Sequence, residues 1–111
     1  MSRLPPALAA SATPRVLEEL GEPPARVLEL GFAGIHAPLL RLAGFEVVVV
    51  EPDPAHRDRA RERAGDVLTE PPPGEAFDAI VAPDGADLAG ATARRVVVVG
   101  QDGSVWSSAS S

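Results

Sequence analysis

The chain has 111 residues, the length of a single domain. Its 16 acidic and 10 basic residues give a formal net charge of −6, which opposes binding to a nucleic-acid backbone or to an anionic membrane surface. Cysteine is absent and there are only two histidines, so a disulfide framework, a thiolate metal site and a histidine cluster are excluded. No run approaches 18 apolar residues and the N-terminus lacks a signal-sequence pattern, which predicts a soluble, cytoplasmic protein.

The N-terminal part predicts an arm followed by a helix. Residues 1–12 are rich in alanine and proline without a sustained period, so we expect a flexible arm. Thr13 and Pro14 then form a helix start, with threonine as the N-cap and proline in the first turn, and Gly21 ends the helix. One α/β domain is expected from this helix to residue 106.

Residues 25–54 carry the strongest pattern in the chain. An apolar run at 26–30 predicts a strand, a small-residue turn follows at 31–34, and a second apolar run at 45–50 predicts a strand closed by Glu51. In such a unit the glycine-lined backbone approaches a ligand, and an acid about 20 residues further on accepts a hydrogen bond from a ribose hydroxyl. The pattern therefore predicts a nucleotide-like ligand.

A helix is expected between these two strands. Pro38 is tolerated in its first turn, and its buried face is predicted from the spacing of four apolar residues, namely Ile35, Leu39, Leu42 and Ala43. His36 lies at the start of this helix and is compatible with two roles, a general base or a capping or exposed histidine.

The second half of the chain predicts further strands and helices. Asp53 and Pro54 begin a helix that should end at Gly65, with only alanines on its buried side. A third strand at 66–68 is short or missing. The later expected elements are a strand at 77–82, a helix at 86–94, a strand at 95–99, a hairpin turn at 101–103 leading to Trp106, and a disordered tail at 107–111.

A family resemblance adds to this pattern. The segment Val27-Leu-Glu-Leu-Gly-Phe-Ala-Gly34 resembles the first motif of class I S-adenosylmethionine-dependent methyltransferases, in which hydrophobic residues and an acid precede Gly-x-Gly-x-Gly. Glu51 matches the acid that ends the second strand in that family, Gly65-Asp66 its Gly-Asp pair near the adenine, and residues 77–81 its fourth strand. Ala33 and Ile35 stand where the second and third glycines are usual.

The resemblance covers residues 26–100 and implies both a fold and a cofactor. The implied fold is a three-layer, Rossmann-like α/β sandwich with a mostly parallel sheet of four or five strands, truncated at its C-terminus. The implied cofactor is S-adenosylmethionine, with its methionine amino group near Glu29 and its ribose held by Glu51. The implied cofactor-binding residues are Glu29, Gly31, Phe32, Ala33, Gly34, Glu51, Pro52, Asp66, Val67 and Asp84. No catalytic residue and no metal ligand is assigned.

The residues themselves leave alternatives open. Glu29 is either a strand-end acid facing solvent or a ligand contact, and Asp84 is either a turn residue or a site residue at the carboxyl end of a strand. Three functions follow: a methyltransferase-like domain, catalytic or not; an interaction or assembly module without a cofactor; and an NAD- or nucleotide-binding regulatory domain. A homodimer or a partner subunit could use the sheet edge at the truncated end.

Overall fold

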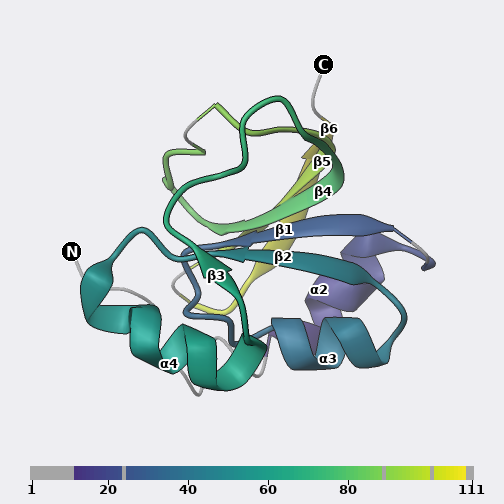
Figure 1. Cartoon of the computed structure of the whole chain (residues 1–111). Coiled ribbons are helices and arrows are strands. Elements are labelled where there is room, and N and C mark those ends of the chain that lie inside the picture. Colours follow the sequence, from purple (N-terminus) through teal and green to yellow (C-terminus); the bar gives the residue numbers. More distant parts are fainter. Residues whose placement is uncertain (1–11, 24, 89, 101, 110–111) are drawn as a thin grey trace.

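A computed structural model describes residues 12–23, 25–88, 90–100 and 102–109 (Figure 1). Within these ranges three helices alternate with the first strands, and four strands then follow in succession. In order the elements are α2 (Thr13–Leu20), β1 (Arg26–Leu30), α3 (Ala37–Leu42), β2 (Glu46–Val50), α4 (Pro54–Ala64), β3 (Val67–Leu68), β4 (Ala76–Pro83), β5 (Thr92–Val99) and β6 (Val105–Ala109).

The six strands form one sheet in the order β3-β2-β1-β4-β5-β6. The first five strands are parallel, and β6 alone is antiparallel to its neighbour β5. The expected mostly parallel α/β architecture is thus confirmed, whereas the expected number of four or five strands is wrong. The short third strand is also confirmed, because β3 has only two residues.

The sixth strand comes from the expected hairpin. The backbone N–H of Gly103 donates to Gly100, and the side chain of Asp102 accepts from the backbone N–H of Ser104, so the turn closes on itself. The returning chain pairs with β5 as far as Ala109. The prediction of a disordered tail is therefore wrong for residues 107–109, because β5 supplies the pairing that the serine-rich sequence alone does not suggest.

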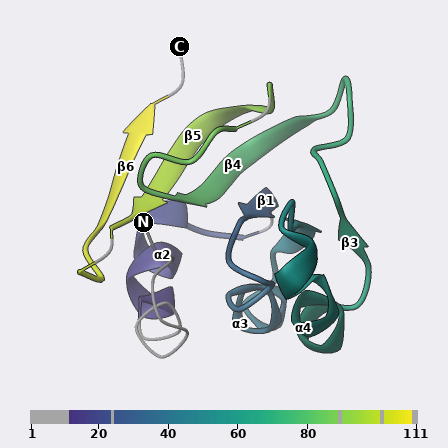
Figure 2. The same cartoon turned by 90° about the vertical axis from the view of Figure 1, so that its left-hand side faces the viewer.

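All three described helices lie on the same side of the sheet, as Figure 2 shows. On that side a core forms around Val27, Leu40 and Val97. On the opposite side Leu28 and Ile80 are buried beneath partly buried residues of the segment between β4 and β5, such as Leu88. The expected three-layer sandwich therefore lacks helices in its third layer within the described ranges, where connecting segments cover the sheet instead.

The helix predicted at 86–94 is absent from the described residues of that segment. Gly85 and Gly90 have φ of 79° and 80°, and β5 already begins at Thr92. Two left-handed residues so close together leave too few residues for a stable helix.

Two helices differ in detail from the prediction. In α2 the N-cap is Ala12, which is buried in the core, and Thr13 is the first helical residue, so the expected threonine cap is wrong. The remaining residues of the expected arm, 1–11, lie outside the described part of the chain. In α3 the buried residues are Ala37 and Leu40, whereas Leu39 and Leu42 are exposed.

Helix α4 agrees with the prediction. The side chain of Asp53 accepts from the backbone N–H of Ala55, and Gly65 ends the helix with φ 82°. Ala60 and Ala64 are its buried residues. With 11 residues it is the longest helix described, and none in the described ranges has the length and apolarity that crossing a bilayer requires.

Candidate functional site

The turns that follow β1, β2 and β4 meet at the carboxyl ends of these parallel strands. The backbone N–H of Gly31, directly after β1, donates to the carbonyl of Val50, the last residue of β2, at 3.0 Å. A Cβ placed on Gly31 would lie 3.5 Å from the ring of Pro83, the last residue of β4. The three turns from which the sequence predicted a site are therefore neighbours.

The loop after β1 has an unusual backbone. Gly31 and Gly34 have φ of 81° and 70°, and Ala33 has φ 52°, the one described non-glycine residue with a positive φ. Such a conformation costs an alanine on the order of 1 kcal/mol. Both backbone groups of Ala33 are bonded in compensation: its N–H donates to Glu51 Oε1 at 2.8 Å, and its carbonyl accepts from Arg63 Nη1 at 3.2 Å.

Gly34 allows this loop to pack against α4. A Cβ on Gly34 would lie 3.1 Å from the Cβ of Ala64 and 3.2 Å from the carbonyl oxygen of Ala60. Glycine is thus required here both for its left-handed backbone and for close approach between the loop and the helix.

Glu51 is fully buried and joins the loop to the end of β2. Its Oε1 accepts from Ala33 as described, and its Oε2 accepts from the backbone N–H of Asp53 at 3.1 Å. The backbone carbonyl of Glu51 accepts from Arg57 Nε at 3.0 Å. One carboxylate therefore orders two turns at once.

Glu29 is also fully buried, so the alternative of a strand-end acid facing solvent is wrong. Its Oε2 accepts from the backbone N–H of His36 at 3.4 Å, while its Oε1 has no hydrogen-bond partner among the residues that the structure describes. Burial and, to a smaller extent, the neighbouring Glu51 raise the pKa of Glu29 from 4.5 to about 7, against the lowering effects of loop amides and Arg41. The side chain therefore exists in both protonation states near neutral pH.

His36 is buried beside this acid, so the prediction of an exposed histidine is wrong. Its Nδ1 lies 2.7 Å from the hydroxyl of Thr13, and its ring packs edge-on against Phe32 with centroids 4.7 Å apart. Its Nε2 has no hydrogen-bond partner in the described part of the chain. Although it occupies the N-cap position of α3, its side chain makes no capping bond. Burial lowers the pKa of His36 to about 4, so the ring is neutral.

The contact between Thr13 and His36 had no signal in the sequence. The two residues are 23 positions apart, and each was assigned a local role at the start of its own helix. The polar cluster under the loop therefore consists of Thr13, Glu29, His36 and Glu51, of which only the two acids were predicted as site residues.

The remaining predicted site residues divide by exposure. Phe32, Ala33 and Gly34 are buried, Gly31 and Val67 are partly exposed, and Pro52, Asp66 and Asp84 are exposed. Asp84 follows β4, where its backbone N–H donates to the carbonyl of Val99 at 3.1 Å. Val67 is the first residue of β3, whose two residues pair with Val49 and Val50 at the carboxyl end of β2, and Asp66 directly precedes it.

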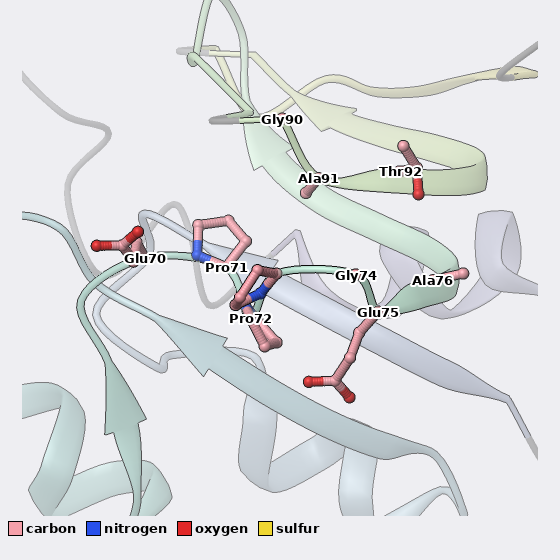
Figure 3. Close-up of a pocket in the computed structure, with 10 residues that line it drawn as sticks. Glu70, Pro71, Pro72, Gly74, Glu75, Ala76, Gly90, Ala91 and Thr92 are labelled. Atoms are coloured by element: carbon pink, nitrogen blue, oxygen red, sulfur yellow. The ribbon is translucent and has the colours of Figure 1, made fainter.

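A cavity of about 450 Å³ lies at the other end of the sheet (Figure 3). It is lined by residues 70–76 and 90–92, next to the amino ends of β4 and β5. None of the predicted site residues contributes to its lining. Within the described ranges no group of three or more histidine, aspartate or glutamate side chains could hold a metal ion.

Comparisons with known proteins support the fold and leave the function open. No family model and no curated protein matches this chain. Among solved structures it is similar to one titled "crystal structure of AibC", with a TM-score of 0.59 and 23% sequence identity over 84% of this chain. The match covers 34% of AibC, so this chain spans about a third of that protein's length. A likeness at this level of identity shows the fold alone.

Proposed function

We propose that this chain is a Rossmann-like, methyltransferase-like domain that binds S-adenosylmethionine. The observation that carries the proposal is Glu29 Oε1, a buried acceptor below the loop after β1 that has no hydrogen-bond partner among the described residues. A 2.8 Å hydrogen bond from the N–H of Ala33 to Glu51 Oε1 joins the same loop to the acid that ends β2. The sheet order reverses between β1 and β4, and ligands of open α/β sheets bind at such a reversal, outside the carboxyl ends of the strands.

Two buried acids would hold the cofactor at its two ends. Glu51 would accept from the ribose hydroxyls. Glu29 Oε1, which lacks a partner, would accept from the methionine ammonium group. A positive charge beside Glu29 would also favour its ionised form, because an opposite charge lowers the pKa of a carboxyl group.

The bound cofactor supplies an activated methyl group, and the chain's own residues bind and orient it. Transfer of a methyl group depends chiefly on alignment with the acceptor, so no acid–base residue is required beyond this cluster. Because Glu29 and Glu51 are both fully buried, ligand entry requires the loop at residues 31–36 to separate from Glu51. Binding should therefore be slow relative to diffusion and should alter the environment of the loop.

A second candidate is an interaction module without a cofactor. It is favoured by the complete burial of both acids, each of which accepts from a backbone N–H of the loop. In this reading the carboxylates stabilise the left-handed turn, and the function lies on the surface of the domain. The sheet order also matches that of dinucleotide-binding domains, so NAD is the third ligand to compare.

Calorimetry with S-adenosylmethionine, S-adenosylhomocysteine, NAD and ATP tests these alternatives. Heat and thermal stabilisation with the first two alone support the proposal. A response to NAD alone supports the dinucleotide alternative, and no response to any of the four supports the module without a cofactor.

Glu51→Gln sharpens the test, because the amide keeps the size of the side chain but places a donor against the N–H of Asp53. We expect the affinity for S-adenosylmethionine to fall at least about tenfold, which corresponds to about 1.4 kcal/mol. Glu62→Gln, an exposed change on α4, is the matched control and should bind normally. Equal affinities in the two variants would remove Glu51 from the binding site.

A further inference from the structure

Among the described residues the outer edge of β6, the last strand of the sheet, has no pairing partner, and its hydrogen-bonding groups can be assigned. The N–H of Gly100 donates to the carbonyl of Ser104 at 2.8 Å, which makes these two residues a hydrogen-bonded pair of the hairpin. Hydrogen-bonded and non-hydrogen-bonded pairs alternate along an antiparallel ladder. Trp106, opposite Val98, therefore directs its backbone groups toward β5, whereas Val105 and Ser107 direct theirs away from the sheet.

This edge lacks the features that usually prevent strand pairing. Strand β6 has five residues, Val-Trp-Ser-Ser-Ala, with no charge and no proline. The opposite edge strand, β3, has only two residues and is soon followed by Glu70 and three prolines. An uncharged edge of this length is a template for a further strand.

The face of the sheet beside this edge is apolar. The side chain of Ser107 bonds to Glu19 on α2, so alternation along the strand directs Trp106 to the face opposite the described helices. Trp106 is 41% exposed, and Val96 and Val98 of β5 are partly exposed on the same face. Together they form a small apolar strip that reaches the edge of the sheet.

Helix α2 runs beside β6 and carries both signs of charge along it. Glu19 Oε1 lies 2.6 Å from the hydroxyl of Ser107. The Ser104 hydroxyl and amide and, to a smaller extent, the charge of Arg15 lower the pKa of Asp102, so Arg15 lies toward the hairpin turn. Arg15 and Glu19 are one helical turn apart, about 6 Å, which is about the rise of two strand residues. Counted from Ser107, which Glu19 contacts, toward the hairpin, this distance puts Arg15 level with Val105 and the midpoint of the two level with Trp106.

We propose that two copies of this chain associate through β6, antiparallel about a twofold axis at Trp106, to form one continuous sheet. In this register Val105 of each copy forms a hydrogen-bonded pair with the partner's Ser107. The two copies of Trp106 face each other as a non-hydrogen-bonded pair, the arrangement in which cross-strand side chains lie closest. The apolar strips of the two copies then become continuous.

The charges on α2 select this register. Strands lie about 4.8 Å apart and α2 packs over both β5 and β6, so the two copies of α2 would lie about 10 Å apart, close to the distance for packed helices. An axis at Trp106 brings Arg15 of one copy level with Glu19 of the other. An axis one residue later, at Ser107, would instead place the two Glu19 side chains opposite each other. The proposal concerns β6 and α2 alone and does not depend on cofactor binding.

Sedimentation of the full chain from about 1 to 300 µM tests the proposal, since it detects a dimer whose Kd lies in or below this range. Ser107→Pro removes an outward N–H and leaves the hydrogen bonds to β5 in place, a position at which an edge strand tolerates proline. Ser107→Ala is the matched control, because it keeps the N–H and removes only the bond to Glu19. We expect a dimer for the natural chain and for Ser107→Ala, and a monomer of unchanged circular dichroism for Ser107→Pro.

A charge exchange provides a second readout if the proline variant fails to fold. Arg15→Glu should weaken the dimer about fivefold or more, and the double variant with Glu19→Arg should restore it, because each altered residue then faces its altered partner. The chain has one tryptophan and no tyrosine, so a tryptophan exciton signal in circular dichroism should accompany dimer formation. A monomer over the whole concentration range, or a dimer that persists in Ser107→Pro, would overturn the proposal.

Discussion

The buried pair Glu29 and His36 predicts an unusual dependence of stability on pH. In the folded chain burial raises the pKa of Glu29 from 4.5 to about 7 and lowers the pKa of His36 from 6.5 to about 4. Between pH 4.5 and 6.5 the folded chain therefore holds a neutral acid and a neutral ring, whereas the unfolded chain holds a carboxylate and an imidazolium. Folding moves one proton from the imidazole to the carboxyl group and leaves the number of bound protons unchanged.

The two groups contribute opposite slopes to the free energy of unfolding. The contribution of Glu29 is fully present below pH 4.5 and is lost as the pH rises through about 7. The contribution of His36 is fully present above pH 6.5 and is lost as the pH falls through about 4. Each slope is about 1.4 kcal/mol per pH unit, so between pH 4.5 and 6.5 they cancel in the natural chain.

Removal of one group should reveal the slope of the other. In Glu29→Gln the free energy of unfolding, relative to the natural chain, should rise by about 2 kcal/mol from pH 4.5 to 6.5. In His36→Gln it should fall by a similar amount, and the double variant should again follow the natural chain. Relative values remove the contributions that exposed groups make in all variants.

Urea unfolding at pH 4.5, 5.5 and 6.5 measures these differences, provided that the slope with urea is the same in all variants. Glu62→Gln, whose side chain is exposed, is the control and should differ from the natural chain by a constant amount. If the difference between Glu29→Gln and the natural chain were also constant with pH, the acid would titrate normally, and the assignment of a buried neutral carboxyl group would be wrong.

Two further predictions concern packing. Gly34→Ala should lower the free energy of unfolding by about 2 to 3 kcal/mol, because it adds a clash with Ala64 to the cost of a left-handed alanine, whereas Gly85→Ala, with open space around it, should cost about 1 kcal/mol. Thermal or urea unfolding measures both costs, and equal values for Gly34→Ala and Gly85→Ala would contradict the predicted clash. Leu40→Ala should cost about 2 to 4 kcal/mol and Leu42→Ala less than about 0.5 kcal/mol in the same assay, since only Leu40 is buried; the reverse order would mean that α3 presents its other face to the sheet.

The elements that the sequence predicted well are those defined by local chemistry. Strand β2 and the valines of β5 lie where continuous β-branched runs placed buried strands, and α4 begins and ends at its aspartate cap and its glycine. In each case the signal lies within a few residues of the element itself. The same holds for the hairpin, whose Asp-Gly turn returns the chain toward β5.

The features that differ from the sequence prediction depend on contacts that no local pattern encodes. The spacing of apolar residues predicted that Leu39 and Leu42 lie on the buried face of α3. This helix has only six residues, however, and the loop before it fixes the rotation of the helix by bonding to Glu51. For His36 the sequence left a general base or a capping or exposed histidine, because a histidine at a helix start usually meets water. Here the hydroxyl of Thr13, from another helix, provides a partner inside the protein.

The site residues show why a sequence motif and a binding function are separable. Ala33 has a left-handed backbone and a buried N–H, and a buried N–H without an acceptor costs about 1 to 3 kcal/mol. Glu51 supplies that acceptor, so a loop of this shape needs an acid at the end of β2 whether or not a ribose ever arrives. The spacing from Gly31 to Glu51 is therefore explained by folding alone. What folding does not explain is Glu29 Oε1, a buried acceptor whose partner within the described residues is missing. A cationic ligand group that satisfied this oxygen would be the first evidence that the site binds a molecule as well as its own backbone.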